Sequence, residues 1–576
     1  MAEPPRKRPR LSPPPASPKP TPPGEPSRTI SASTTTTSAA APAAPAATLV
    51  ETLKSDQART LASHQVHEPS HYSHRVTPFQ QPLHLTSFSY SPTRQLLLDS
   101  HNRDDSLSYY REPRLGSDLN HGFDRAVWRD GTVDEGLDAL LDTLDHWARS
   151  DPSGAAADLL AKTALITWRG MLTKLMLAVY ECDNLAHGRR ADGWEMNAML
   201  VEDCLYLEES NPPAKLAAKA ESERSGPGAL PSYYGYSFEA YCTTSAPSRT
   251  LSNPHAPPPP PSRGPDEDDG FSVPNTNVQW CSVVKTSLGG CRTIVGGEVD
   301  CLRPTADMTR GVSTNDFIEL KTNLVIQSLR DEINFERQKL LKHYVQSFLL
   351  GVPTVTVGFR TRQGQLANLQ SFNTLDLPRM VRGKPHAWDP SVCLTSAHDL
   401  LDFIRRTVAA AMSAPANSSE STSPSSPPVF RISFSPHATP SSGSFPTVTI
   451  RQLTAELVES EVVGGKKAVA GGRIGFLPRT WAEARRAHRV AASERGTLTA
   501  HTASSSLQAK PRPAQSRPPP PPPPPPPPAG AVSNPTDSAS SAAGMPPAAV
   551  DSPAAPSMPK STSAGRPGGV AALLKR

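Results

Sequence analysis

Proline is concentrated in a few dense blocks, and these blocks limit which part of the chain can fold. The chain contains 65 prolines among 576 residues. The blocks rich in proline, or in serine and threonine, are residues 1–85, 243–273, 413–428 and 492–576. Such sequence buries too little apolar surface to offset the entropy lost on ordering. We therefore predict two disordered tails, two disordered insertions and one folded domain over residues 86–491.

Cysteine usage and apolar patterning exclude several kinds of site. The seven cysteines form no CxxC pair and no Cys/His cluster with zinc spacing, so we predict no zinc site. The chain has neither a signal peptide nor a long apolar segment, and we expect a reduced intracellular compartment and no membrane partner. The net charge of +5 is modest for this length, so any affinity for phosphate must be local.

A basic cluster, Arg6-Lys7-Arg8-Pro9-Arg10, lies in the first predicted tail. Clusters of this kind act as nuclear-import signals, and we predict a nuclear location. A solvated basic patch without function is the alternative, and the cluster alone does not exclude it.

The apolar periodicity predicts a mixed α/β fold. Apolar residues at helical spacing predict helices over 134–148, about 156–182 and about 331–350. Runs of β-branched residues predict strands over 278–288, 292–300, 316–322 and 354–360. Gly289 and Gly290 indicate a tight turn between the first two strands, which should therefore pair antiparallel. The order strand, helix, strand after this hairpin is typical of a twisted sheet flanked by helices.

Two short motifs place charged side chains on these predicted strands. The first is Gly297-Glu298-Val299-Asp300, and Glu319-Leu320-Lys321 begins nineteen positions after its aspartate. Residues i and i+2 of a strand project from one face, so Glu298 should lie beside Asp300. Glu319 should lie beside Lys321 for the same reason. Three carboxylates and one ammonium can therefore converge.

The converging groups have the chemistry of a metal-dependent nuclease. Carboxylate oxygens suit Mg²⁺ or Mn²⁺, and two such ions can activate a water and neutralise a leaving oxygen. The Leu320 carbonyl can add a neutral oxygen ligand. Lys321 can stabilise the charge that develops on a phosphoryl group. An ordinary salt bridge on an exposed strand is the alternative for the pair Glu319 and Lys321.

Two further charged residues lie in unusual surroundings. Arg169 precedes Leu172 by three residues and Met176 by seven, which places it on an apolar helix face. Such an arginine points into the protein or a cleft, or it extends its charged end to solvent. Glu239 ends an aromatic segment, residues 233–242, which alone predicts only a buried turn and a helix start.

Several blocks of the sequence resemble the DXO/Rai family of RNA decapping nucleases. The blocks are Thr167-Trp168-Arg169-Gly170, Gly235-Tyr236-Ser237-Phe238-Glu239, Gly297-Glu298-Val299-Asp300-Cys301, Glu319-Leu320-Lys321-Thr322, Lys339-Leu340-Leu341-Lys342 and Gln346-Ser347-Phe348-Leu349. They follow the family's order and cover nearly all of residues 86–485. The resemblance implies an α/β fold with a core like that of PD-(D/E)xK nucleases, and the insertions interrupt none of the blocks.

The resemblance also implies which residues act at the site. The implied metal ligands are Glu239, Glu298, Asp300, Glu319 and the Leu320 carbonyl. The implied catalytic residues are Glu239, Asp300, Glu319 and Lys321. The implied substrate contacts are Arg94, Glu135, Trp168, Arg169, Gly170, Cys281, Lys321 and Gln346. The implied cofactor is a divalent cation, Mg²⁺ or Mn²⁺, with two ions in the site.

The implied activity is hydrolysis at RNA 5′ ends in RNA quality control. Members of the family remove NAD caps and incomplete or unmethylated caps, and they release pyrophosphate from 5′-triphosphate RNA. The resemblance to fungal-type members implies a partner, a nuclear 5′-to-3′ exoribonuclease of the Rat/Xrn type, and a part in RNA and pre-rRNA processing. A non-catalytic stabilising partner of that exoribonuclease is one alternative. A DNA endonuclease is another, but it leaves the Trp168 and Gln346 blocks without a role.

Overall fold

The computed structural model describes residues 58–186, 191–226, 228–245, 271–413, 427–436 and 445–507, without the side chains of 183–186 and 495–507. All of these residues lie in one of the chain's two compact units, Asp56–Arg576. The basic cluster at residues 6–10 lies outside the described residues, as do most of the two predicted insertions. Among the described residues, no helix is both long and apolar enough to cross a membrane. All seven cysteines are free thiols.

The larger sheet contains ten strands in the order β1-β16-β15-β6-β7-β5-β10-β9-β2-β3. Their bounds are β1 Ala58–Gln65, β2 Phe79–Tyr90, β3 Leu96–Leu97, β5 Leu165–Trp168, β6 Trp194–Val201, β7 Cys204–Glu209, β9 Gln279–Leu288, β10 Cys291–Glu298, β15 Phe430–Ser435 and β16 Thr447–Leu453. The predicted pair β9 and β10 is antiparallel, which confirms that prediction. Gly289 and Gly290 form its turn with φ of 56° and 85°, values that favour glycine.

The smaller sheet has six strands in the order β14-β13-β12-β11-β4-β8. Their bounds are β4 Tyr109–Tyr110, β8 Thr243–Thr244, β11 Cys301–Leu302, β12 Phe317–Leu324, β13 Thr354–Arg360 and β14 Leu366–Asn373. Strands β12 and β13 run parallel, and a helical crossover joins them as predicted. Because β10 belongs to the larger sheet and β11 to the smaller, Val299 and Asp300 lie where the chain passes between the sheets.

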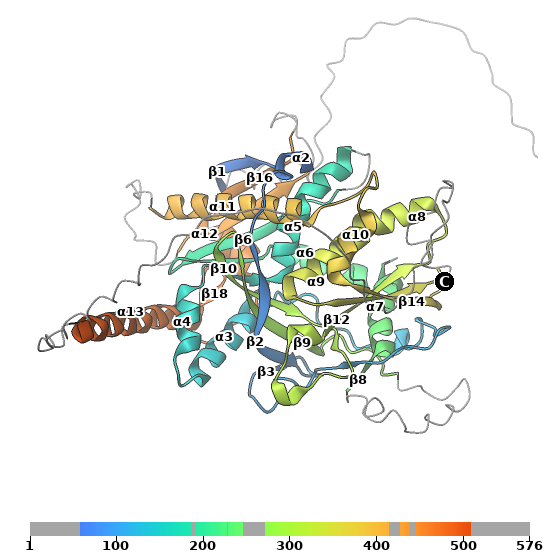
Figure 1. Ribbon diagram of the computed structural model, residues 1–576, viewed down its shortest axis with the longest axis horizontal. Helices are drawn as coiled ribbons and strands as arrows, with labels where there is room; N and C mark the ends of the chain where they lie inside the picture. The colour runs from blue at the N-terminus through green and yellow to red at the C-terminus, as the bar shows by residue number, and fades with distance from the viewer. Residues whose placement is uncertain are drawn as a thin grey trace, which may run out of the picture. The chain divides into compact units, whose positions relative to one another are not determined.

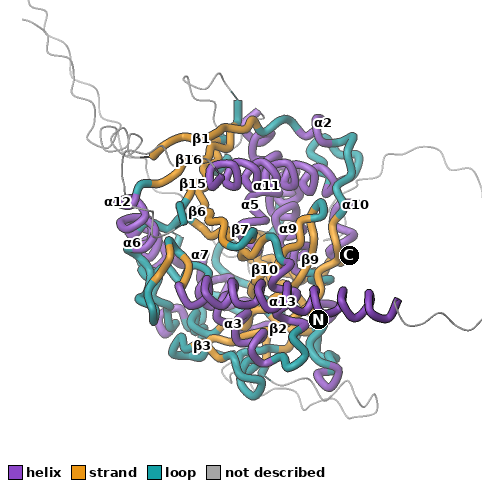
Figure 2. Tube along the Cα trace, turned by 90° about the vertical axis from the view of Figure 1, so that its left-hand side faces the viewer, coloured by secondary structure: helices purple, strands orange, loops and turns teal. Residues whose placement is uncertain are grey.

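Helices cover both faces of the larger sheet (Figures 1 and 2). Their bounds are α2 Pro69–Tyr72, α3 Asp138–Ser150, α4 Ala155–Lys162, α5 Arg169–Ala186, α6 Pro213–Arg224, α7 Ala229–Cys242, α8 Leu329–Asn334, α9 Leu341–Leu350, α10 Leu377–Val381, α11 Pro390–Ser413, α12 Ala455–Leu457 and α13 Arg479–Leu507. A π-helical segment, Phe335–Leu340, joins α8 to α9. Strands β17 Arg473–Ile474 and β18 Leu477–Pro478 form a separate pair.

The central strands bury alternate residues in two different cores. Val284 and Val295 belong to the core beneath α5, α9 and α11. Their strand neighbours Val283 and Ile294 belong to the core beneath α3, α4 and α13. Since successive strand residues face opposite sides, a strand that is covered on both faces carries a nearly continuous run of apolar residues. Each fully buried valine or isoleucine contributes about 1.5–3 kcal/mol, so these strands fix the sheet that carries the site.

The helix predicted over 156–182 is wrong as one element. The structure divides it into α4, strand β5 and α5. The strand contains Ile166 and Thr167, whose β-branched side chains favour an extended backbone, and both are fully buried. Helices with leucines at helical spacing flank the strand on both sides, which explains the error. The break matters because it places Arg169 at the first position of α5 rather than in a helix interior.

The folded region extends beyond both predicted boundaries. Residues 1–85 were predicted to be a disordered tail, but this range includes β1, α2 and the start of β2. Strand β1 pairs with β16, nearly 400 residues later, so its order comes from a distant partner and not from local apolar pattern. At the other end, the folded domain is predicted to stop at residue 491, but α13 continues to Leu507. It packs Trp481, which is 3% exposed, into the second core.

Burial of His84 predicts a loss of stability in acid. This imidazole on β2 shares a hydrogen bond of 2.9 Å with the Ser282 hydroxyl. Burial lowers its pKa to about 4, although Asp104 opposes the shift. Because the unfolded chain binds the proton first, stability is complete above pH 6.5 and declines towards pH 4. Between pH 6.5 and pH 4 the unfolding free energy of the wild type should therefore fall by up to about 3 kcal/mol more than that of a His84→Phe variant.

Urea unfolding measured between pH 7 and 4 tests this expectation. The exposed His101 supplies a control, because a His101→Phe variant should follow the wild type. Equal slopes for wild type and His84→Phe would contradict the account.

Candidate active site

Four carboxylates converge at the junction of the two sheets. Glu239 comes from α7, Glu298 ends β10, Asp300 precedes β11 and Glu319 lies on β12. Strands β11 and β12 pair with Cys301 opposite Ile318, which brings Asp300 next to Glu319. The Leu320 backbone N–H donates to Asp300 Oδ2 at 2.6 Å and fixes that side chain. Helix α7 packs on β12 and supplies Glu239 from a different layer.

Two cationic side chains lie among these carboxylates. Arg169 Nη1 donates to Glu319 Oε2 at 2.9 Å, so the first residue of α5 points into the protein as one reading predicts. Lys321 Nζ lies 2.7 Å from Glu319 Oε1 and 3.6 Å from Asp300 Oδ2. It also donates to the Leu320 carbonyl at 2.9 Å. The Glu319 side chain is 1% exposed and that of Lys321 is 24% exposed, so only the lysine faces solvent appreciably.

Electrostatics divides the carboxylates into two kinds. Burial, together with Glu319 and Glu298, raises the pKa of Asp300 to about 7, although Lys321 opposes the shift. Burial and the neighbouring Asp300 also raise the pKa of Glu239 well above its usual value. For Glu319, burial is outweighed by Arg169 and Lys321, which lower its pKa to about 2. Glu319 is therefore an anion that two cations hold, whereas Asp300 and Glu239 lack sufficient positive charge.

The donor set suits a divalent cation by its chemistry. When all four carboxylates are ionised, they exceed the two cations by about two negative charges, which a hard cation can neutralise. Glu319 Oε1 is a buried acceptor without a hydrogen bond, because its close approach to Lys321 lacks hydrogen-bond geometry. Within the described residues, no three Asp, Glu, His or Cys side chains already stand in a ligand geometry. Lys321 contacts three oxygens of the set, those of Glu319, Asp300 and Leu320.

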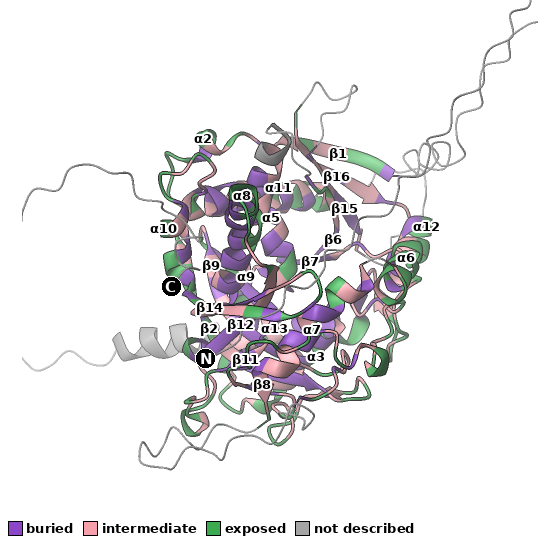
Figure 3. Ribbon diagram, turned by 90° about the vertical axis from the view of Figure 1, so that its right-hand side faces the viewer, coloured by how far each residue is buried: buried purple, intermediate pink, exposed green. Residues whose placement is uncertain are grey.

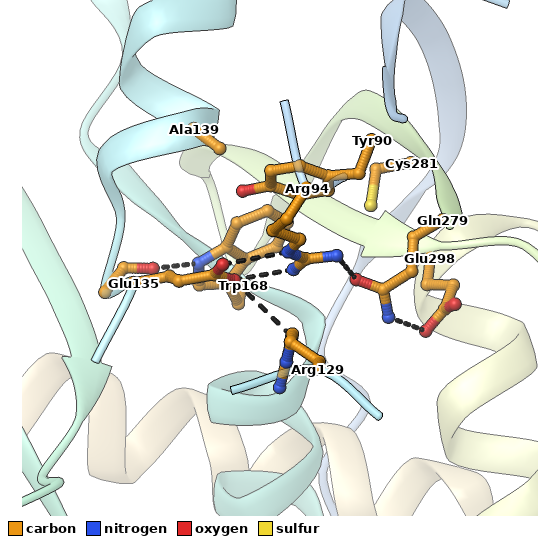
Figure 4. A pocket seen from close by; sticks show the side chains of 10 residues that line it. Tyr90, Arg94, Arg129, Glu135, Ala139, Trp168, Gln279, Cys281 and Glu298 are labelled. Carbon is orange, nitrogen blue, oxygen red and sulfur yellow. Dashed lines mark hydrogen bonds and ion pairs between the residues drawn. The ribbon is translucent and has the colours of Figure 1, made fainter. Parts of the chain in front are cut away.

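A cavity of about 240 Å³ opens beside Glu298 (Figure 4). Its lining residues are Tyr90, Arg94, Arg129, Glu135, Gly136, Ala139, Trp168, Gln279, Cys281 and Glu298. Four of the predicted substrate contacts, Arg94, Glu135, Trp168 and Cys281, therefore lie in one cavity. The walls combine aromatic rings with charged groups, as sites for small polar ligands commonly do.

A line of hydrogen bonds joins this cavity to the carboxylates (Figure 4). Arg94 donates to both carboxylate oxygens of Glu135, at 2.8 and 2.6 Å. It also donates to Gln279 Oε1 at 2.7 Å, and Gln279 donates to Glu298 Oε2 at 3.0 Å. The Arg94 guanidinium stacks 3.5 Å from the centre of the Tyr90 ring. These contacts hold Arg94 in a left-handed backbone with φ of 62°, which is unusual for arginine.

The junction of β5 and α5 presents Trp168, Arg169 and Gly170 to the site. Trp168 Nε1 donates to the Gly136 carbonyl at 2.7 Å, which fixes its ring in the cavity wall. Gly296 lies opposite Trp168 on β10, and a Cβ there would come within 2.8 Å of the ring. At Gly170 a Cβ would meet nothing within 4 Å. The space in front of Gly170 is therefore open to a ligand.

Two glutamines differ in how well the sequence predicted them: Gln346 is a predicted substrate contact, whereas Gln279 was not predicted. Gln346 lies on α9, and within the described residues it forms no hydrogen bond with the carboxylates. Gln279 is the missed residue, since it joins Arg94 to Glu298. Its position two residues before Cys281 on β9 was the available signal, because both side chains project from one face of the strand.

The site and fold match one family of nucleases. A sequence model described as "RAI1 like PD-(D/E)XK nuclease" matches residues 80–453. A curated relative, "Decapping nuclease RAI1" of Mycosarcoma maydis, is 34% identical over 464 residues, which cover 70% of this chain and 87% of the relative.

Two solved structures share the fold. Scheffersomyces stipitis Rai1 in complex with (3′-NADP)⁺ and calcium ion is 20% identical, covers 74% of this chain and 98% of its own, and has a TM-score of 0.54. Candida albicans Rai1 in complex with pU5-Mn²⁺ is also 20% identical, covers 75% and 99%, and has a TM-score of 0.54.

Proposed function

Because the chain belongs to the family of RAI1-like PD-(D/E)XK nucleases and is a hydrolytic RNA decapping enzyme, we propose that it removes NAD caps and incomplete or unmethylated caps from RNA. We propose further that it releases pyrophosphate from 5′-triphosphate RNA. The observation that carries this proposal is the convergence of four carboxylates, Lys321 and Arg169 beside a cavity with aromatic walls. The relatives that bind (3′-NADP)⁺ and pU5 support both kinds of ligand.

Glu239, Glu298, Asp300, Glu319 and the Leu320 carbonyl would hold a divalent cation, Mg²⁺ or Mn²⁺, and we propose two ions. When bound, such ions activate a water for attack on phosphorus and neutralise the leaving oxygen. The complexes of relatives with Mn²⁺ and calcium support this choice of cofactor.

The chain's own cations act on the phosphate. Lys321 is on the solvent side of the cluster, where its ammonium can donate to a phosphoryl oxygen of the 5′ end. Negative charge develops on that oxygen during attack, and the Lys321 ammonium, which is already in place, stabilises it. Arg169 keeps Glu319 ionised and oriented. In our proposal Gln346 contacts the scissile phosphate and the cavity of Arg94, Glu135, Trp168 and Cys281 holds the group that leaves.

A panel of RNA 5′ ends tests the proposal. Purified protein is incubated with Mg²⁺ or Mn²⁺ and RNAs that carry a triphosphate, an NAD cap, an unmethylated cap or a monophosphate. We expect release of pyrophosphate, NAD and cap dinucleotide from the first three. Absence of all three products, with an intact fold, would reject the enzyme and favour a scaffold.

We also propose a nuclear location and a stabilising association with a 5′-to-3′ exoribonuclease of the Rat/Xrn type. The support is the basic cluster at residues 6–10 and the resemblance to fungal-type members of the family. Through that association the protein would take part in RNA quality control and pre-rRNA processing. Reciprocal co-purification from nuclear extract, compared with a chain that lacks residues 1–10, tests location and association separately.

The open space at Gly170 predicts an effect on RNA without an effect on folding. In Gly170→Ala the new methyl group meets no protein atom, so we expect unfolding stability to be unchanged or up to about 1 kcal/mol higher. We expect the KM for RNA to rise several-fold, because the methyl group enters the space where the substrate is proposed to lie.

Gly296→Ala supplies the contrasting control. Its methyl group overlaps the Trp168 ring, so we expect a loss of about 1–3 kcal/mol. Urea unfolding and steady-state kinetics separate the two variants. An unchanged KM for Gly170→Ala would place the RNA elsewhere.

A further inference from the structure

A second cavity, of about 200 Å³, lies between α5 and the helical segment that leads to the active site. Its lining residues are Leu177, Tyr180, Glu181, Asp192, Arg337, Gln338, Lys339, Leu341 and Lys342. None of them belongs to the catalytic cluster or to the first cavity. Helices α5 and α9 pack together, and the π-helical segment Phe335–Leu340 contacts both α8 and α9 (Figure 3).

Two lysines on this cavity lack a counter-charge. Lys339 and Lys342 are exposed, and within the described residues neither forms an ion pair. Although the side chain is exposed at the surface, partial burial of its amine in the cavity wall and the adjacent Lys342 lower the pKa of Lys339, and no carboxylate opposes this shift. Two ammonium groups that repel each other at the mouth of a cavity are stabilised by an anion.

Arg337 also lines the cavity, and it has partners within the protein. The buried Arg337 donates to the His386 and Ala387 carbonyls at 3.4 Å, and its guanidinium lies 5.1 Å from the centre of the Tyr180 ring. Across the cavity Glu181 accepts a hydrogen bond from the Asp192 backbone N–H at 3.3 Å. The acidic groups therefore border one side, and the free positive charge is on the side of Lys339 and Lys342.

The lysines share a helix face with a residue of the proposed active site. Lys339, Lys342 and Gln346 are spaced by three and four residues, which places them in one row. His343, in the same turn, is buried and within electrostatic range of Lys321 as well as of both lysines. Lys339 precedes Gln346 by seven residues and Lys342 precedes it by four, which is about 10 Å and about 6 Å along the helix, so an anion held between the two lysines lies at least one helical turn away from Gln346.

The start of this row is the π-helical segment Phe335–Leu340. Such segments are rare and occur frequently at functional sites, because the extra residue shifts the helix face. Here Glu336 holds the segment in place, since it accepts from Lys384 Nζ at 2.5 Å and is paired with His386 at 2.6 Å. The position of Lys339 relative to Gln346 is therefore fixed by buried contacts.

From these observations we propose that Lys339 and Lys342 bind backbone phosphates of the RNA body, downstream of the 5′ end held at the catalytic cluster. The inference rests on the proposed function for the identity of the anion. It explains how one enzyme could act on chemically different 5′ ends, because part of the affinity would come from phosphates that all RNAs share.

Binding is tested without turnover, by fluorescence anisotropy in Ca²⁺ with 5′-monophosphate RNAs of 2, 4, 8 and 16 nucleotides. For Lys339→Ala/Lys342→Ala we expect roughly tenfold weaker binding of the 16-nucleotide RNA and a salt slope that is smaller by about 1.4. Binding of the dinucleotide and of free NAD should not change. Lys339→Arg/Lys342→Arg should restore the affinity.

A matched control removes two positive charges elsewhere. Lys162 lies on α4 and Arg486 on α13, and neither residue lines either of the two cavities. The Lys162→Ala/Arg486→Ala variant should therefore bind RNA as tightly as the wild type.

Three results would overturn the inference. The Lys339→Ala/Lys342→Ala protein could lose as much affinity for the dinucleotide as for the 16-nucleotide RNA, or it could lose no affinity for the 16-nucleotide RNA. The control variant could also lose as much affinity as the Lys339→Ala/Lys342→Ala protein. If inorganic phosphate competes in the wild type but RNA length has no effect, the cavity is a free-phosphate site and the inference is also wrong. Failure of cap release in the activity assay is a separate result and would reject the proposed function alone.

Discussion

Replacement of both Asp300 and Glu319 by alanine is expected to lower the rate of cap release roughly a thousandfold or more. The two carboxylates are bonded to the Leu320 N–H and to Arg169, so they hold the geometry of the cluster as well as its charge. Without them only two carboxylates of the cluster, Glu239 and Glu298, remain as ligands for a cation. Single-turnover release of NAD from NAD-capped RNA is the appropriate measurement.

The control for this variant is a pair of exposed acidic residues, Asp376→Ala with Glu459→Ala, which should retain full activity. Thermal unfolding must accompany the assay. Loss of Glu319 leaves Arg169 and Lys321 without their partner, whereas loss of Asp300 relieves repulsion, and these effects oppose each other. If the Asp300→Ala/Glu319→Ala protein is folded and as active as the wild type, the site has been assigned to the wrong residues.

Lys321→Ala is expected to slow the chemical step about 10²- to 10³-fold and to leave metal affinity the same or higher. In the structure the ammonium contacts oxygens of Glu319, Asp300 and Leu320, so it competes with a cation for these atoms. Its removal therefore frees the ligands but takes away the donor proposed for the phosphate. Mn²⁺ titration by calorimetry and single-turnover kinetics separate the two effects.

Lys321→Arg keeps the charge and should recover part of the rate, which distinguishes charge from shape. Weaker Mn²⁺ binding in Lys321→Ala, with an unchanged rate at saturating metal, would contradict the role assigned to this lysine. It would instead make Lys321 a residue that organises the ligands.

Part of the site could be predicted because it depends on strand geometry. Glu319 and Lys321 alternate with buried Ile318 and Leu320 on β12, so a period of two already placed both charges on one face. The prediction that Glu298 and Asp300 lie close together is correct, but the two residues do not lie on one strand as predicted. Strand β10 ends at Glu298, and Asp300 lies in the passage between the sheets.

Site residues and strands that are positioned by packing between distant elements could not be predicted from the local sequence pattern. Glu239 lies on α7, 59 residues before Glu298, and only the packing of α7 on β12 brings it to the cluster. The resemblance to a known family supplied it, and no periodicity did. Strand β1 was missed for a similar reason, because its sequence has little apolar pattern and its order comes from β16.

The most direct test of the central claim is the dependence of NAD release on a divalent cation. NAD-capped RNA is incubated with metal-stripped protein over a Mn²⁺ titration, and the products are identified by mass spectrometry. The account predicts no release without metal, saturable release of NAD with Mn²⁺, reversal by EDTA and recovery on addition of excess Mn²⁺. Release that is independent of metal, or no release at any Mn²⁺ concentration from folded protein, would contradict it.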